Sequence, residues 1–169
     1  MRIGKHEVPY PLIQGGMAVR VSGYRLAGNV ARCGGIGLVA TAGIGINTPR
    51  FKGDNYFGAE PLALKDGVIG TNCMVAVTDY AELVKASCEG GAKLIVSGAG
   101  LPMNLPELTA DWPDVALVPI VSSVKAAELI TRKWHKSYGR LPDAVVVEDP
   151  DTAGGHLGEK LEKIGTGEY

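Results

Sequence analysis

The sequence has almost no net charge. Its 17 lysine and arginine residues are opposed by 18 aspartate and glutamate residues, which gives a formal charge of −1 at pH 7. Nucleic acids and anionic membrane surfaces attract proteins that carry an excess of positive charge. We therefore expect neither a nucleic acid nor a membrane as a partner of this chain.

Cysteine is also scarce. The three cysteines form no CxxC or Cys/His ligand pattern, and their odd number argues against a disulfide framework. A reducing cytoplasm is the simplest setting for such a chain. The N-terminal segment lacks the apolar core of a signal peptide, and no apolar run approaches the roughly 18 residues of a membrane span. We predict a cytoplasmic protein without a metal centre.

Glycine, in contrast, is abundant, at 24 of 169 residues, against an average usage of about 7%. The glycines cluster directly after apolar strand candidates, in the segments QGGMA, TAGIG, SGAG and TAGGH. Glycine has no Cβ, so a ligand can approach its backbone closely. The placement predicts one shared surface at the ends of several strands, where main chain rather than side chain meets a ligand.

Apolar runs alternate with helical patterns along the chain, which is typical of parallel sheets built from βα units. Ser22 is positioned to cap the first helix, Thr78 or Asp79 to cap the second, and Gly90 to end it. The crossover at 42–67 contains only a weak helix near 59–65. We expect strands at 11–17, 36–41, 67–76, 93–98, 116–123 and 143–149, and helices at 23–33, 78–91, 104–112 and 124–138.

Six strands of this kind can start either a doubly wound sheet or a (β/α)8 barrel. No GxGxxG motif opens a helix after the first strand, which argues against a dinucleotide-binding doubly wound sheet. The length of 169 residues argues against a complete barrel, since a complete one typically needs about 250 residues. The strand pattern therefore favours a barrel, whereas the length of the chain is too short for a complete one.

The octapeptide DTAGGHLG contains the most distinctive candidate residue, His156. The run AVVV at 144–147 predicts a parallel strand buried on both faces, so the octapeptide follows a strand end. Gly154 and Gly155 would let a large, flat molecule approach the backbone, and His156 could donate, accept or hold a proton there. An exposed turn histidine is the alternative interpretation.

Five motifs, in this order, resemble the nitronate monooxygenase family, formerly called 2-nitropropane dioxygenases. They are PLIQGGMA, GGIGLVATAG, GTNCMVAV, SGAGLP and TAGGHLG, and together they span nearly the whole chain. The flavin-dependent enoyl-acyl carrier protein reductases are close relatives with similar motifs. The resemblance implies an α/β fold of the TIM (β/α)8-barrel type, of which this chain contains about six of eight βα units, forming a single FMN-binding domain over 1–169.

The resemblance also implies where FMN and the substrate lie. His156 is the implied catalytic residue. Alternatives remain for three positions: Asn72 as a strand-end turn residue, Met17 as a core residue and Lys125 as a surface lysine. Lys125 is a candidate by its position alone, because it follows the fifth strand and could reach the negative charge of the flavin. The full set of cofactor-binding candidates is Gly15, Gly16, Met17, Asn72, Lys125, Asp149, Gly154 and Gly155.

The implied reaction is oxidation of an alkyl nitronate or nitroalkane by O2, with FMN as cofactor. An imidazole near neutral pKa can hydrogen-bond the nitro group or handle the proton. Two alternatives stay open: an NAD(P)H-dependent flavin reductase such as an enoyl-thioester reductase, and a non-catalytic fragment or interaction subunit.

Two departures from the family pattern stand out. Many members have a glutamine five residues before the first glycine of AGGH, whereas this chain has Asp149, which cannot donate a hydrogen bond when ionised. The sequence also ends at Tyr169, before the glycine-rich strands seven and eight that bind the FMN phosphate in the family. We expect an incomplete barrel that is a fragment, a truncated gene product or part of a longer protein. If the chain exists alone at this length, we expect its open edges to be covered by another chain, as in a homo-oligomer.

Overall fold

The computed structural model describes residues 1–18, 21–43, 67–149 and 153. Its main sheet is parallel and follows chain order, β3-β4-β5-β6-β7. Ile13 adds a parallel bridge to Ile36 at the β3 edge, so six chain segments line up in order. The strands of the sheet are β3 (Ile36–Ala40), β4 (Val68–Met74), β5 (Leu94–Gly98), β6 (Ala116–Val121) and β7 (Val146–Val147).

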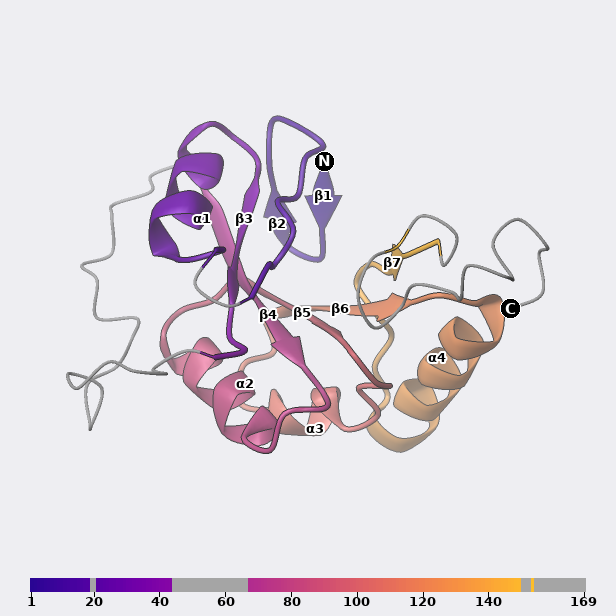
Figure 1. The fold of residues 1–169 in the computed structure, drawn as a ribbon. Coiled ribbons are helices and arrows are strands. Elements are labelled where there is room, and N and C mark those ends of the chain that lie inside the picture. Colours follow the sequence, from indigo (N-terminus) through magenta and orange to yellow (C-terminus); the bar gives the residue numbers. More distant parts are fainter. Residues whose placement is uncertain (19–20, 44–66, 150–152, 154–169) are drawn as a thin grey trace, which may run out of the picture.

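Within the described residues, four helices accompany these strands. Figure 1 shows these helices in an arc around the outside of the sheet. Residues on the outer face of the sheet, such as Ile95 and Leu117, pack against α2, α3 and α4. Helix α1 also packs closely on the sheet, at Gly37 of β3. A Cβ at this position would lie only 1.9 Å from the Ala27 carbonyl oxygen. The helices are α1 (Tyr24–Arg32), α2 (Tyr80–Glu89), α3 (Leu105–Leu108) and α4 (Val124–Tyr138).

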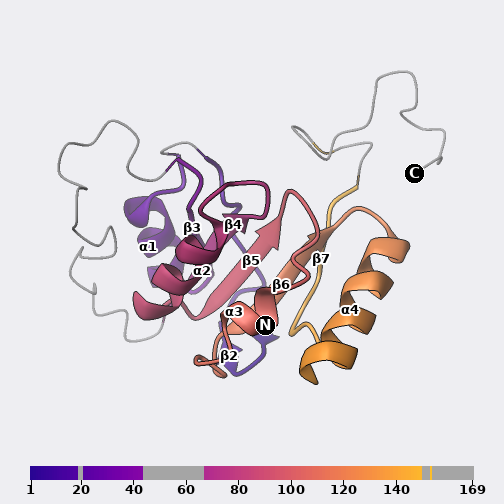
Figure 2. The same cartoon turned by 90° about the horizontal axis from the view of Figure 1, so that it is seen from below.

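The inner face of the sheet is filled by apolar side chains instead of helices. They alternate with the outward residues along each strand, as the pleat requires. Ile3 and Val8, from and beside the N-terminal hairpin, complete this inner cluster, whose other buried members are Ile36, Leu38, Val68, Leu94, Val96, Ala116 and Val118. A doubly wound sheet carries helices on both faces. The described chain is therefore a curled half-barrel, which confirms the TIM-barrel prediction (Figure 2).

The N-terminal hairpin, β1 (Arg2–Ile3) and β2 (His6–Glu7), was not predicted from the sequence. It lies at the amino ends of the strands, where Lys5 forms an ion pair with Asp114 and His6 Nε2 lies 3.0 Å from the Asp114 carbonyl oxygen. In barrels of this type the amino-end face contributes to stability, whereas active sites lie at the carboxyl ends.

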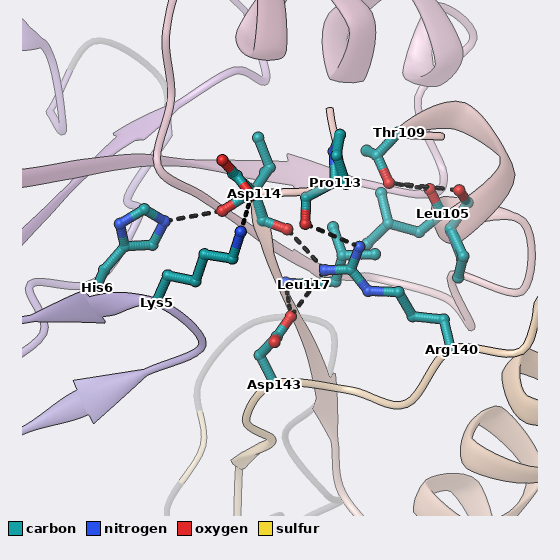
Figure 3. A network of polar contacts seen from close by, with 11 residues as sticks. Lys5, His6, Leu105, Thr109, Pro113, Asp114, Leu117, Arg140 and Asp143 are labelled. Atoms are coloured by element: carbon teal, nitrogen blue, oxygen red, sulfur yellow. Dashed lines mark hydrogen bonds and ion pairs between the residues drawn. The ribbon is translucent and has the colours of Figure 1, made fainter. Parts of the chain in front are cut away.

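A second polar network occupies the same amino-end face (Figure 3). The Asp143 carboxylate accepts hydrogen bonds from the Leu117 amide, at 2.8 Å, and from Arg140, at 3.0 Å. Arg140 also donates to the Val115 carbonyl at 2.8 Å. The Asp143 amide donates to the Leu117 carbonyl, so this residue extends the β6–β7 pairing toward the amino end.

We expect Asp143→Ala to lower the free energy of unfolding by about 1–3 kcal/mol, because the Leu117 amide would lose its side-chain acceptor and Arg140 would lose one of its acceptors. Urea denaturation measures this loss. Asp114→Ala is the matched control, since the side chains of Asp114 and Lys5 are both 70% exposed and exposed ion pairs contribute little. Equal destabilisation by the two variants would contradict the structural role of Asp143.

Several expected elements are shorter than predicted. The first strand, expected at 11–17, reduces to the single bridge at Ile13, and the helix at 104–112 forms only the single turn of α3. The strand at 143–149 reduces to β7, where Val147 is 75% exposed. The prediction of a strand buried on both faces was wrong there, because β7 is the last strand of the described sheet. The weak crossover helix at 59–65 lies outside the described residues.

One capping prediction was wrong. The N-cap of α1 is Gly23, without a side-chain hydrogen bond, and Ser22 directs its hydroxyl elsewhere. Asp79 is the N-cap of α2, as one of the two alternatives predicted, but it too forms no side-chain cap. Gly90 ends α2 as expected, as its C-cap in right-handed conformation, and the left-handed residue is the following Gly91, with φ +84°.

The three cysteines differ sharply in accessibility. Cys33 is exposed, whereas Cys73 and Cys88 are buried. Burial raises the pKa of the Cys88 thiol to about 11 and also raises that of Cys73. Because only the thiolate reacts, we expect one fast-reacting thiol at pH 8 in the native chain and three in urea, measured with a disulfide reagent such as DTNB. Two or more fast thiols in the native chain would contradict this packing.

Candidate functional site

Strand β4 and the segment after Ile13 meet at the carboxyl end of the sheet. Asn72 Nδ2 donates to the Gly16 carbonyl at 3.1 Å, although the two residues are 56 positions apart. A Cβ on Gly16 would lie 2.2 Å from the Asn72 Cβ, which no real side chain could tolerate. Only glycine fits here, and the sequence prediction that Gly16 and Asn72 share one surface agrees with this contact.

Asn72 is held by its own strand. It pairs with Ala40 of β3 and Val96 of β5, and its carbonyl accepts from both the amide and the hydroxyl of Thr41, at 3.0 and 3.1 Å. The neighbouring Cys73 lies in the outer cluster, so alternation along the strand places Asn72 on the inner face. Its side-chain amide is therefore set at the inner rim of the half-barrel.

The loop of Gly15, Gly16 and Met17, called the 15–17 loop below, is open on its other side. A Cβ on Gly15 would have no heavy atom within 4 Å. Met17 is 48% exposed, so core packing does not explain its presence. The loop thus offers bare backbone and one apolar side chain at the mouth of the half-barrel.

The end of β5 contributes a strained segment that was not predicted from the sequence. Ala99 adopts φ +55°, a left-handed conformation that few residues other than glycine adopt. It stands between Gly98, where a Cβ would lie 2.9 Å from the Ile120 Cβ, and Gly100, with φ +128°. Strain of this kind often clusters at ligand sites. The SGAG pattern drew attention to the glycines, but nothing local reveals the conformation of Ala99.

At the end of β7, two neighbouring carboxylates lie in different environments. Glu148 is half-buried, as is Val146 two residues earlier, and its amide donates to the Val121 carbonyl at 2.9 Å. Asp149, the residue singled out from the sequence, is exposed, and its carbonyl accepts from the Ala153 amide at 2.8 Å. Side chains on a strand point to alternate faces. Counting by twos from Val146 would therefore also have indicated Glu148 as a residue on the inner face.

The structure says less about the remaining predicted site residues. Lys125 lies in the first turn of α4 and is exposed. Gly154, Gly155 and His156 lie outside the described residues. The described part of the chain contains no group of three or more His, Cys, Asp or Glu side chains that could hold a metal ion. Nor is any helix in it long and apolar enough to cross a membrane.

An apolar groove of about 310 Å³ lies elsewhere, between α1 and the segment that leads into Ile13. It is close to the amino end of β3, where Tyr10 donates its amide to the Gly34 carbonyl. It is therefore separate from the rim formed by Asn72 and the 15–17 loop. Its lining residues are Tyr10, Leu12, Asn29, Val30, Cys33 and Gly35.

Comparison with known proteins agrees with this architecture. FabK from Thermotoga maritima and its M276A mutant each match 90% of this chain with 26% sequence identity and a TM-score of 0.68. The matched region is 44% of the first chain and 47% of the second, so this chain spans less than half the length of either. No curated protein matches significantly. The family model for nitronate monooxygenase matches residues 59–169. This chain therefore belongs to the nitronate monooxygenase family, as its five motifs predicted.

Proposed function

We propose that the chain forms a single FMN-binding domain of an oxidoreductase that oxidises alkyl nitronates or nitroalkanes with O2. The observation that carries the proposal is the contact between the 15–17 loop and Asn72 at the carboxyl-end rim. Barrels of this type bind cofactors and substrates at that rim. Members of the family are flavin enzymes, which supports FMN as the cofactor.

The described residues fit a flat aromatic ring. Gly15 leaves open space where a side chain would stand, and the exposed Met17 offers an apolar, polarisable surface. Asn72 already uses its side-chain amide on Gly16, which leaves its carbonyl oxygen Oδ1 able to accept from a ring N–H. The rim thus combines backbone, one apolar group and one hydrogen-bond acceptor.

The remaining roles follow from the family motifs. Gly154 and Gly155, which follow β7 in the sequence, would bring bare backbone to the flavin ring, and His156 would stand beside the substrate. Lys125 and Asp149 are proposed as further cofactor contacts. We add Glu148, a half-buried residue at the end of β7, to this set.

The substrate chemistry matches these residue types. A nitroalkane has an acidic carbon and a polar nitro group, and His156 could hydrogen-bond the nitro oxygens or accept the carbon-bound proton. FMN, when bound, supplies the electron transfer and oxygen chemistry. The protein residues bind, orient and handle the proton.

The test is to purify the chain, record its visible absorption spectrum with added FMN, and assay propionate 3-nitronate and 2-nitropropane under O2. We expect a bound-flavin spectrum and turnover of at least one substrate. If neither a bound flavin nor turnover is found, the proposed function is wrong.

A second candidate is an NAD(P)H-dependent flavin reductase of the enoyl-thioester reductase kind. The likeness to FabK over 90% of this chain favours it. Both candidates use the same rim, so the reductant distinguishes them. Rapid anaerobic bleaching of the flavin by NADH or NADPH would support the reductase, whereas bleaching by nitronate alone would support the monooxygenase.

A further inference from the structure

The hydroxyl of Ser22 is the centre of a fully satisfied buried network. Ser22 is 2% exposed. Its Oγ donates to the Gly15 carbonyl at 2.8 Å and accepts from the Met17 amide and from Gln14 Nε2, each at 2.8 Å. A hydroxyl has one donor and two acceptor positions, so none remains for capping α1. The serine is committed to the 15–17 loop instead.

Gln14 also helps to hold the 15–17 loop. Its backbone amide donates to the Ile36 carbonyl at 2.9 Å, which is the last strand-like contact of this segment with β3. Its side-chain Oε1 then accepts from the Leu38 amide at 3.1 Å, where a continuing strand would have placed a backbone carbonyl. The side chain thus takes over the pairing with β3, and the backbone is free to turn toward Asn72.

The amide of the same side chain faces the loop. Gln14 Nε2 donates to the Gly15 carbonyl as well as to the Ser22 hydroxyl. The backbone of Ser22 adds two further links, because its amide donates to the Met17 carbonyl and its carbonyl accepts from the Ala40 amide, each at 2.9 Å. The loop is therefore held from β3 and from the start of α1, while Asn72 holds it from β4.

We propose that Ser22 and Gln14 are positioning residues that hold the 15–17 loop in its flavin-binding conformation before any cofactor binds. Ordering of the loop then occurs on folding rather than on binding, which strengthens cofactor affinity. This inference rests on the proposed function, because it takes FMN as the group that meets the loop.

Ser22→Ala removes the central hydroxyl and should raise the Kd for FMN about tenfold, as loss of one such polar link would do. Fluorescence titration of the full chain with FMN measures it. Ser87→Ala is the matched control, because Ser87 is also buried and its hydroxyl donates to the Leu83 carbonyl of α2, away from the loop. Ser22→Thr retains the hydroxyl and should restore FMN affinity.

A second measurement needs no cofactor. The Met17 amide donates to the Ser22 hydroxyl at 2.8 Å and also to the Gly15 carbonyl at 3.1 Å. Ser22→Ala removes the shorter of these bonds and also the hydroxyl that holds Gly15, so hydrogen exchange of this amide should accelerate about tenfold without FMN. The same amide should exchange at the wild-type rate in Ser87→Ala. Equal exchange in all three proteins would overturn the proposal.

Gln14→Glu separates the two functions of the glutamine. A carboxylate can still accept from the Leu38 amide but cannot donate to the Gly15 carbonyl or the Ser22 hydroxyl. We expect FMN binding relative to wild type to be weakened more at pH 8 than at pH 4, because protonation below the ordinary glutamate pKa of about 4.3 restores a donor. A ratio that does not change with pH would count against the donor role.

The outcomes separate this inference from the proposed function. If the wild-type chain does not bind FMN, the proposed function fails, and the exchange of the Met17 amide alone decides whether Ser22 holds the loop. If the wild type binds FMN but Ser22→Ala and Ser87→Ala bind it equally well, the positioning role is refuted. If Ser22→Ala does not fold, Ser22→Thr and Gln14→Glu decide.

Discussion

Replacing His156 by alanine is expected to lower turnover of a nitronate or nitroalkane about 10²–10⁴-fold, which is the usual contribution of a positioned acid or base. FMN should remain bound, since backbone at the rim and not the imidazole is proposed to hold the ring. Steady-state oxygen consumption measures turnover, and the flavin absorption of the purified variant measures occupancy.

His135→Ala is the matched control for this experiment. His135 is exposed in the last turn of α4. Its removal should leave both turnover and FMN content unchanged. If His156→Ala turns over as fast as the wild type, the histidine of the AGGH motif is not the catalytic residue.

Trp134→Ala is expected to lower the free energy of unfolding by about 3–5 kcal/mol, the largest stability effect that we predict for a single substitution. Trp134 is 0% exposed and belongs to the cluster that joins α4 to the outer face of the sheet. Its indole N–H also donates to the Pro102 carbonyl at 2.9 Å. Alanine would leave a cavity, and the Pro102 carbonyl would keep only its hydrogen bond from the Leu105 amide, at 3.2 Å. Urea denaturation followed by circular dichroism measures the loss.

Two controls separate the parts of this effect. Trp134→Phe retains most of the buried volume but loses the N–H, so it should cost about 1–2 kcal/mol. Leu129→Ala lies on the same helix at a position that is 44% exposed and should change stability by about 0.5 kcal/mol or less. If Trp134→Ala destabilises no more than Leu129→Ala, α4 is not packed as described.

Much of the fold was predictable because the relevant signals are local. Helix α4 occupies Val124–Tyr138, as expected from its periodicity, and the order of strands and helices follows the alternation of apolar runs. The family was also predictable, because five motifs in order are specific. The N-terminal hairpin was not, since its strands are two residues long and depend on contacts with Asp114 and the inner cluster.

The candidate site was predictable only in part. Glycines after each strand indicated the rim, and Gly16 and Asn72 do meet there. The conformation of Ala99 left no local signal. Ser22 shows most clearly why the sequence was not enough. A serine beside a helix start usually caps the helix. Here the hydroxyl instead bonds three partners in the buried segment around Gly15 and Gln14, and these bonds outweigh a single cap.

The sequence by itself determined the order of the βα units, the absence of side chains at the strand ends and the family. These depend on spacing along the chain. Only the tertiary structure decided that the sheet curls around the hairpin, that β7 is the last strand of the described sheet, and that Ser22 and Gln14 bond to the 15–17 loop. The reason is physical: periodicity shows which residues are buried together, but partners far apart in the chain are chosen by packing and by the requirement that buried polar groups find hydrogen bonds.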